Sequence, residues 1–180
     1  MALPTLTTER LLLRPLNHGD LDDLFEYAQD KAVYEHGMWQ PYGSKDEARK
    51  HLDELLASYI QGLMWWAIEY TLDKKMIGRV ELSYVDREDQ HAEISYALNQ
   101  QYWHRGIMTE AMECIIDYAF QTMKLNRLYA RTLTDNTASC NLLGKMSFQR
   151  EGHLREHSQV KGYPEDIYIY GLLKSDLTSS

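Results

Sequence analysis

The residues with the clearest chemical potential stand where a predicted strand, Glu93–Leu98, leads through a turn into a predicted helix. The turn contains His104, Arg105 and Gly106. Main-chain N–H groups at a helix start have no partner within the helix, and with the helix dipole they favour an anion such as a pyrophosphate. Gly106 would let that group approach the main chain, and Arg105 would add positive charge. On spacing alone, the segment predicts either a phosphate-binding turn or an ordinary strand-to-helix turn.

Other kinds of site find less support in the sequence. No Gly-x-x-x-x-Gly-Lys-Ser/Thr motif occurs, so nucleotide hydrolysis is not expected. No metal site is expected, because His153 and His157 fall in a predicted strand and the loop after it rather than on one helix face. The two cysteines, Cys114 and Cys140, have no close-spaced partner and are expected to be reduced thiols.

Composition places the chain among folded globular proteins. Its 180 residues suffice for one large core, 44% of them are hydrophobic and 26% are charged. A net charge of −8 without clustered Lys and Arg argues against a nucleic-acid surface, and it suits either simple solubility or cationic partners. The longest apolar window, Leu63–Ile68, is too short to span a membrane, and no targeting segment begins the sequence. We therefore expect a cytoplasmic protein.

Hydrophobic periodicity predicts alternating strands and helices without an interdomain linker or an internal repeat. Strands are predicted at Glu9–Pro15, Met64–Tyr70, Met76–Leu82, Ala92–Leu98, Leu128–Thr134, Phe148–Leu154 and Ile167–Leu173. Helices are predicted at 21–28, from a Ser44–Glu47 capping box to Gly62, after Gly106 to about residue 119, and at Asn136–Met146. The pattern predicts one α+β domain over residues 1–180, with a mixed, mostly antiparallel sheet and flanking helices.

Several short motifs occur together and in a fixed order along nearly the whole chain. They are Thr8-Glu9-Arg10-Leu11-x-Leu13-Arg14-Pro15-Leu16, Ile77-Gly78, Glu93-Ile94-x-Tyr96-x-Leu98, Tyr102-Trp103-x-x-Gly106-x-x-Thr109-Glu110-Ala111, Asn136-x-Ala138-Ser139, Lys145-x-x-Phe148 and Glu151-Gly152-x-Leu154-Arg155, with Asp166 in the final strand. In these motifs the sequence resembles the GNAT superfamily of N-acetyltransferases, particularly the RimJ/RimL-type enzymes that acetylate ribosomal-protein N-termini. The resemblance implies a GNAT fold, a splayed sheet and acetyl-CoA as the co-substrate.

The resemblance also implies roles for particular residues. Acetyl-CoA would lie between strands, with Asn136 binding the pantetheine and Ser139 near the sulfur, where a hydroxyl can protonate the departing thiolate. Asn136 and Ser139 are also the residue types that cap helices, and both roles can hold together. Main-chain groups would bind the pantetheine at Tyr96, Ala97 and Leu98, and the pyrophosphate at His104, Arg105, Gly106, Ile107, Met108 and Thr109.

Direct acetyl transfer to an amine needs a neutral nucleophile and donors for the developing oxyanion, which N–H groups of Tyr96–Leu98 could supply. Glu93, ranked ahead of Glu81, is the candidate general base. Both carboxylates equally suit a solvated strand face. Positioning of two reactants alone can contribute about 7 to 11 kcal/mol, so a dedicated base is not required.

The acceptor remains open at this stage. The resemblance favours the α-amino group of a protein N-terminus, such as a ribosomal protein's; the alternatives are a small amine (a polyamine or an aminoglycoside) and a non-catalytic acyl-CoA-binding module. The last is motivated by Met108 and His104, which stand where the related enzymes often have smaller residues. Specificity is expected to lie in segments 34–63 and 157–165, where aromatic residues such as Trp39 serve as core or as groove wall. A homodimer is compatible with the sequence, which does not set the oligomeric state.

Overall fold

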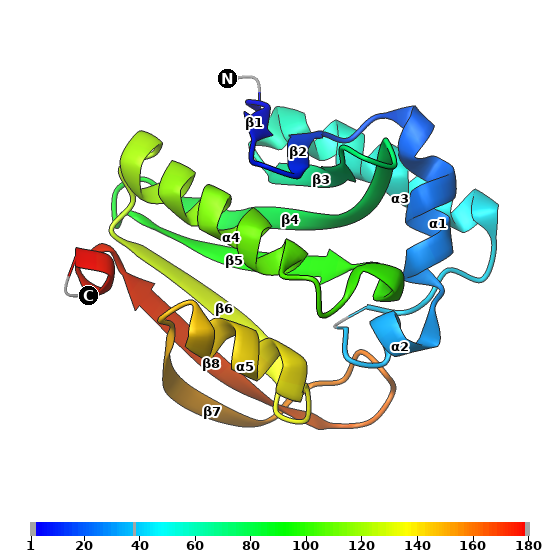
Figure 1. Ribbon diagram of the computed structural model, residues 1–180. Coiled ribbons are helices and arrows are strands. Elements are labelled where there is room, and N and C mark those ends of the chain that lie inside the picture. Colours follow the sequence, from blue (N-terminus) through cyan, green and yellow to red (C-terminus); the bar gives the residue numbers. More distant parts are fainter. Residues whose placement is uncertain (1–2, 38, 179–180) are drawn as a thin grey trace.

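The computed structural model describes residues 3–37 and 39–178, and these form one eight-stranded sheet with helices on both faces (Figure 1). The strands are β1 (Leu6–Thr7), β2 (Leu11–Pro15), β3 (Met64–Tyr70), β4 (Lys75–Asp86), β5 (His91–Leu98), β6 (Arg127–Leu133), β7 (Gln149–Ser158) and β8 (Glu165–Leu173). Their order in the sheet is β1-β2-β3-β4-β5-β6-β8-β7, and only β5 and β6 pair in parallel. The predicted α+β fold with a mostly antiparallel sheet is confirmed.

The helices connect and cover these strands. They are α1 (Leu21–Ala28), α2 (Lys31–Tyr34), α3 (Lys45–Ser58), α4 (Ile107–Asp117) and α5 (Thr137–Lys145), with the short helical segments η1 (His18–Asp20), η2 (Tyr59–Gln61), η3 (Gln100–Tyr102), η4 (Tyr118–Thr122) and η5 (Lys174–Thr178). The sequence pattern did not predict α2 or β1, which are too short to show a period. None of the helices in the described part of the chain has the length and apolar character needed to cross a membrane.

The two faces of the sheet bury separate hydrophobic clusters. Because side chains alternate along a strand, Ile94 and Leu98 pack with α4 on one face, whereas Ala97 packs with α1 and α3 on the other. In Figure 1, α4 and α5 lie in front of the sheet and α3 passes behind β3. The face behind the sheet carries Trp65 of β3 and its neighbour Glu81 of β4, whereas Trp66 packs on the α4 side.

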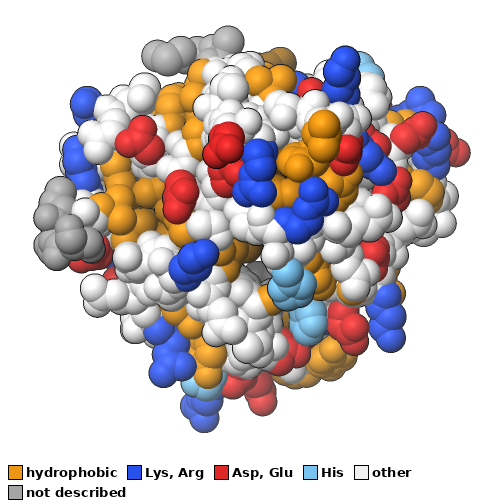
Figure 2. All heavy atoms as spheres, viewed as in Figure 1, with side chains coloured by type: hydrophobic (Ala, Val, Ile, Leu, Met, Phe, Trp, Pro, Cys, Tyr) orange, Lys and Arg blue, Asp and Glu red, His pale blue; other side chains and the backbone are white. Residues whose placement is uncertain are grey.

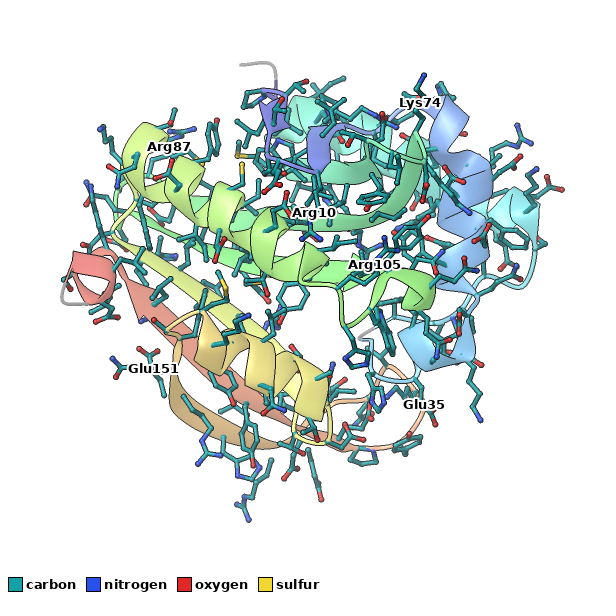
Figure 3. The ribbon with its side chains drawn as sticks, viewed as in Figure 1. Arg10, Glu35, Lys74, Arg87, Arg105 and Glu151 are labelled. Atoms are coloured by element: carbon teal, nitrogen blue, oxygen red, sulfur yellow. The ribbon has the colours of Figure 1, made fainter. Side chains whose placement is uncertain are left out.

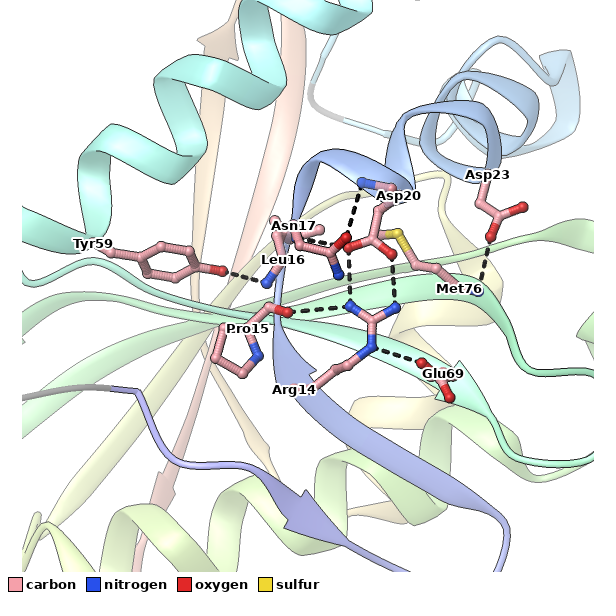
Figure 4. Close-up of polar contacts among 10 residues, drawn as sticks. Arg14, Pro15, Leu16, Asn17, Asp20, Asp23, Tyr59, Glu69 and Met76 are labelled. Atoms are coloured by element: carbon pink, nitrogen blue, oxygen red, sulfur yellow. Dashed lines mark hydrogen bonds and ion pairs between the residues drawn. The ribbon is translucent and has the colours of Figure 1, made fainter.

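A partly buried ion-pair network fixes the corner between β2 and α1 (Figure 4). Arg14 Nη1 and Nη2 donate to the two carboxylate oxygens of Asp20, at 2.9 and 2.7 Å, and Arg14 Nε donates to Glu69 Oε2 at 2.6 Å. Asp20 is almost fully buried and also accepts a hydrogen bond from the Asn17 main chain. Tyr59 reinforces this corner, because its hydroxyl accepts from the Leu16 N–H and donates to the Trp65 carbonyl. The network fixes the edge of the sheet on which α1 and α3 rest.

Gly78 marks a close approach between β4 and β5. A Cβ atom at this position would lie 2.4 Å from the Ala97 carbonyl oxygen and 3.0 Å from Leu98 Cα. Both neighbouring atoms belong to the main chain, which cannot rotate away as a side chain would. Only glycine therefore keeps β5 at its present distance from β4.

We expect Gly78→Ala to lower the free energy of unfolding by about 1 to 3 kcal/mol, because the added methyl group overpacks the β4–β5 ladder. The matched control is Gly144→Ala in α5, where an added Cβ meets no heavy atom within 4 Å. That variant should gain about 0.5 to 1 kcal/mol, as expected for Gly→Ala in an exposed helix. Chemical denaturation measures both. A fully stable Gly78→Ala variant would contradict the steric argument.

Candidate active site

The site is formed where β5 and β6 separate. Their parallel pairing covers only His91–Arg127, Ala92–Leu128 and Glu93–Tyr129. Beyond these three pairs the strands diverge, and a cavity of about 1020 Å³ lies between residues 94–98 of β5 and residues 130–133 of β6. On the face seen in Figure 2, basic and histidine side chains gather around the opening between α4 and α5. The splayed sheet that the resemblance implied is therefore present.

The divergence leaves main-chain groups of β5 without a strand partner. The Asn99 N–H donates to the Ile77 carbonyl of β4 at 2.7 Å. Because successive residues of a strand direct their main-chain groups to opposite edges, Ala97 also faces β4, whereas Tyr96 and Leu98 face the cavity. The Leu98 carbonyl indeed accepts from the Trp103 indole at 2.8 Å. The N–H groups of Tyr96 and Leu98 are thus available to a ligand, and Ala97 contributes only to the cavity wall.

The turn before α4 has the geometry of an anion site. Gly106 is the residue before the helix, with φ of +72°, and no side chain caps the helix at this position. Its carbonyl accepts from the Glu110 N–H, so the N–H groups of Ile107, Met108 and Thr109 have no acceptor inside the helix. These three residues line the cavity, with His104 and Gly106. Met108 places its side chain in the core, which leaves its main-chain donor free.

Arg105 differs from the expectation of a countercharge in the turn. Its guanidinium lies 5.2 Å from the Tyr70 ring centre and 5.1 Å from the Tyr102 ring centre, and Nη2 donates to the Tyr70 hydroxyl. Among the described residues that line the cavity, Arg105 is absent. Its carbonyl accepts from Arg10 Nη1 at 3.0 Å, and Figure 3 shows the two arginines close together beside the start of α4. The faces of these two tyrosine rings attract the positive charge of the guanidinium group and hold it outside the cavity.

A cation that the sequence analysis did not assign to binding lines the cavity instead. Lys145, at the C-terminal end of α5, is an exposed cavity-lining residue. The Lys145-x-x-Phe148 motif singles out this lysine in the sequence. The motif alone does not indicate that the lysine side chain lies at the cavity.

Asn136 and Ser139 meet β5 at the start of α5. Asn136 Oδ1 accepts from the Ser139 N–H at 3.0 Å, so Asn136 caps the helix, and its Nδ2 donates to the His36 carbonyl at 3.0 Å. Ser139 Oγ lies 2.8 Å from the Tyr96 hydroxyl. Burial raises the pKa of Tyr96, so this hydroxyl stays protonated. A hydrogen-bonded pair of hydroxyl groups therefore belongs to residues that line the same cavity as the free N–H groups of β5. Of these two hydroxyls, the sequence motifs indicated only that of Ser139.

The two candidate carboxylates lie in different environments. Glu93 makes a bidentate ion pair with Arg131, at 2.8 and 2.9 Å, at the point where β5 and β6 separate. Glu81 is also buried, but its polar partners are serine hydroxyls: the Ser95 hydroxyl donates to Oε2 at 2.9 Å, and Ser83 is a second partner. Burial raises the pKa of the Glu81 carboxyl, and the Ser95 hydrogen bond and the Arg79 charge partly oppose this rise. Glu93 is occupied by a cation, whereas Glu81 can accept a proton.

Segments far apart in the sequence close the cavity behind the sheet. The loop after α2 contacts α5, because Asn136 Nδ2 donates to the His36 carbonyl. The same part of the chain contacts the β7–β8 loop through two hydrogen bonds. Gln40 Nε2 donates to the Val160 carbonyl, and Lys161 Nζ donates to the Glu35 carbonyl. Trp39 and Arg79 line this part of the cavity, while Trp66 lies in the core. The segments in which we expected acceptor specificity therefore do contact one another.

Comparisons with known proteins agree with this geometry. The family described as "Acetyltransferase (GNAT) domain" matches residues 10–149. The uncharacterized N-acetyltransferase p20 of Bacillus licheniformis is 34% identical over 175 residues, which cover 97% of this chain and 98% of that protein. The [ribosomal protein uS5]-alanine N-acetyltransferase of Escherichia coli is 28% identical and covers 96% of this chain and 92% of its own.

A solved structure shows the same likeness over the whole fold. The Vibrio cholerae spermidine N-acetyltransferase, crystallised with CoA and spermine, superposes with a TM-score of 0.81 at 25% identity, over 95% of this chain and 99% of that one. The cavity volume, the free N–H groups of β5 and the uncapped start of α4 fit a pantetheine arm with a pyrophosphate. The chain therefore belongs to the GNAT family and is an acetyl-CoA-dependent N-acetyltransferase.

Proposed function

We propose that the protein transfers acetyl directly to the α-amino group of a peptide or protein N-terminus. The observation that carries this choice is the charge of the cavity wall. Its arginines and lysine, Arg79, Arg131 and Lys145, outnumber its carboxylates, Glu81 and Glu93, and Glu93 is already paired. A polyamine carries several positive charges and needs several free carboxylates, so this wall disfavours it. The similarity to the uS5-alanine N-acetyltransferase supports the same choice.

Residues of β5, α4 and α5 would hold acetyl-CoA, which supplies the acetyl group as a thioester. The N–H groups of Tyr96 and Leu98 suit the pantetheine and the developing oxyanion, and those of Ile107–Thr109 suit the pyrophosphate. The Ser139 and Tyr96 hydroxyls share a hydrogen bond, and both residues line the cavity, which supports a role in protonating the departing thiolate. We propose Ser139 as the acid and Tyr96 as its hydrogen-bond partner.

We propose Glu81, rather than Glu93, as the general base. A general base must be unpaired and must have a pKa raised toward the working pH, and Glu81 meets both conditions. Glu93 holds Arg131 across the strand divergence and so has a positioning role. One of the two reasons for considering a non-catalytic acyl-CoA-binding module was the bulk of Met108. That reason is weakened, because the Met108 side chain packs in the core and leaves the turn open.

The proposal is tested by release of the CoA thiol from acetyl-CoA with N-terminal peptides, spermine and an aminoglycoside as acceptors. Peptide-dependent release is the expected result. Release with spermine or the aminoglycoside alone would contradict the proposed acceptor, and acetyl-CoA binding without any release would contradict catalysis.

We expect Ser139→Ala to lower kcat by about 10²-fold, the lower end of the range for a lost general acid. The Kd for acetyl-CoA, measured by calorimetry, should change little. Tyr96→Phe keeps the ring and removes the hydroxyl partner, so it should lower kcat less, and the double variant should resemble Ser139→Ala because the two groups act together. If Ser139→Ala weakened acetyl-CoA binding as much as it slowed turnover, the acid role would be wrong.

We expect Glu81→Gln to lower kcat by about 10²-fold or more while raising Tm at pH 7. A raised folded-state pKa means that stability falls as pH rises from the unfolded glutamate pKa through the raised value, and the loss persists at neutral pH. Glutamine removes this loss and can still accept the Ser95 hydrogen bond.

Glu93→Gln provides the comparison, because it leaves Arg131 without its carboxylate. We expect a lower Tm and a smaller loss of kcat than in Glu81→Gln. Steady-state kinetics and thermal denaturation of both variants separate the two roles. A larger loss of kcat in Glu93→Gln, with Glu81→Gln active, would restore Glu93 as the base.

A further inference from the structure

Arg79, on β4, extends behind the sheet into the part of the cavity that the acceptor would enter. Its guanidinium carbon lies 4.6 Å from the Trp65 ring centre and 5.1 Å from the Trp39 ring centre. The guanidinium group thus lies over both tryptophan rings. Rings contacted in this way do not consume its N–H donors, which form a planar fork that matches a carboxylate.

No carboxylate in the described part of the chain forms an ion pair with Arg79, and its buried Nε has no hydrogen-bond acceptor there. The other arginine of the cavity wall, Arg131, has Glu93 as its partner. The Tyr27 hydroxyl is a neighbour of Arg79, because the Arg79 charge opposes the rise in the Tyr27 pKa caused by burial. A neutral hydroxyl does not compensate a cation, and Glu81 interacts with the Arg79 charge without forming an ion pair. Since a charge in a partly buried site is costly without a partner, the missing anion is expected from a ligand.

If Glu81 accepts the proton of the acceptor amine, as proposed above, the amine lies close to Arg79. Arg79 and Glu81 are separated by one residue of β4, so their side chains share a face, about 7 Å apart along the strand. Their partners on β5, Ala97 and Ser95, are small and leave the space over the two charges open. An acceptor with its amine at Glu81 and an anion a few bonds away would reach both charges at once.

We propose that Arg79 binds a carboxylate of the acceptor, so that the enzyme acetylates amines that carry a carboxylate close to the reacting nitrogen. Two sources provide this chemistry: a peptide with Asp or Glu at its first or second position, and a free amino acid. Polyamines and aminoglycosides lack it. The inference rests on the proposed N-acetyltransfer to an α-amine and specifies which α-amines are used.

The test compares acceptors that differ only in charge. The pairs are peptides beginning with Glu or Gln, peptides with Asp or Asn at the second position, and leucine or leucinamide, each with the intact protein and acetyl-CoA. In the pair whose carboxylate position matches that of the natural acceptor, we expect kcat/KM to be about 10- to 100-fold higher for the acidic member than for its amide. This is the range for a charge-assisted hydrogen bond. The preferred pair identifies the source of the carboxylate.

Arg79→Met should reduce kcat/KM for the acidic acceptor to the level of its amide and leave the amide nearly unchanged. Arg79→Lys, which keeps the charge without the fork, should retain part of the preference. Arg87→Met, an exposed arginine after β4, is the matched control and should behave as the wild type. Calorimetric binding of acetyl-CoA and thermal denaturation verify that each variant is folded.

Equal kcat/KM for acid and amide members in the wild type would overturn the Arg79 assignment, even if the Arg79→Met variant failed to fold. An equal loss for both members in Arg79→Met would also overturn it. Either result would leave the proposed function intact if peptides are acetylated. Failure of every α-amine, in contrast, would overturn the proposed function itself.

Discussion

The early end of the pairing between β5 and β6 is the constraint on which the rest of the site depends. Three registered pairs hold the two strands together, and Glu93 with Arg131 forms an ion pair at the last of them. If the ladder continued, the N–H groups of Tyr96 and Leu98 would be consumed by β6. The sheet thus gives up several hydrogen bonds between strands, and the donors released face a cavity instead of a neighbour.

The elements around the divergence keep it from closing. Gly78 lets β5 lie close to β4, so the strand stays on its own side of the gap. The first turn of α4 is tied to the turn between β1 and β2, because Glu110 accepts hydrogen bonds from Thr8 Oγ1 and from Arg10 N and Nε. On the other side, α5 is capped by Asn136, whose amide also holds the loop after α2. Each donor of the site is therefore fixed by an interaction outside it.

The sequence predicted the elements and the anion-binding turn, since periodicity, capping residues and Gly106 act locally. It could not predict contacts that depend on strand register. Arg105 was expected in the turn, but register places Tyr70 and Tyr102 where they hold it. Glu93 and Glu81 look alike in the sequence, and only the parallel β5–β6 register shows that Arg131 neutralises one of them. The Tyr96 side chain was missed for the same reason, because its partner Ser139 comes from a helix 43 residues later.

The unsatisfied charges of the site lie on one face of β4, and this placement has a physical logic. Glu81 is desolvated with serine hydroxyls as its polar partners, and Arg79 has aromatic rings but no ion-pair partner among the described residues. A direct Arg79–Glu81 ion pair would satisfy both, yet the guanidinium lies against the Trp65 and Trp39 rings instead and acts on Glu81 only through its charge. Because Arg79 and Glu81 do not form an ion pair with each other, both can interact with an acceptor that carries an amine and a carboxylate. The fold therefore accepts a local cost in stability at the point where the acceptor must be oriented.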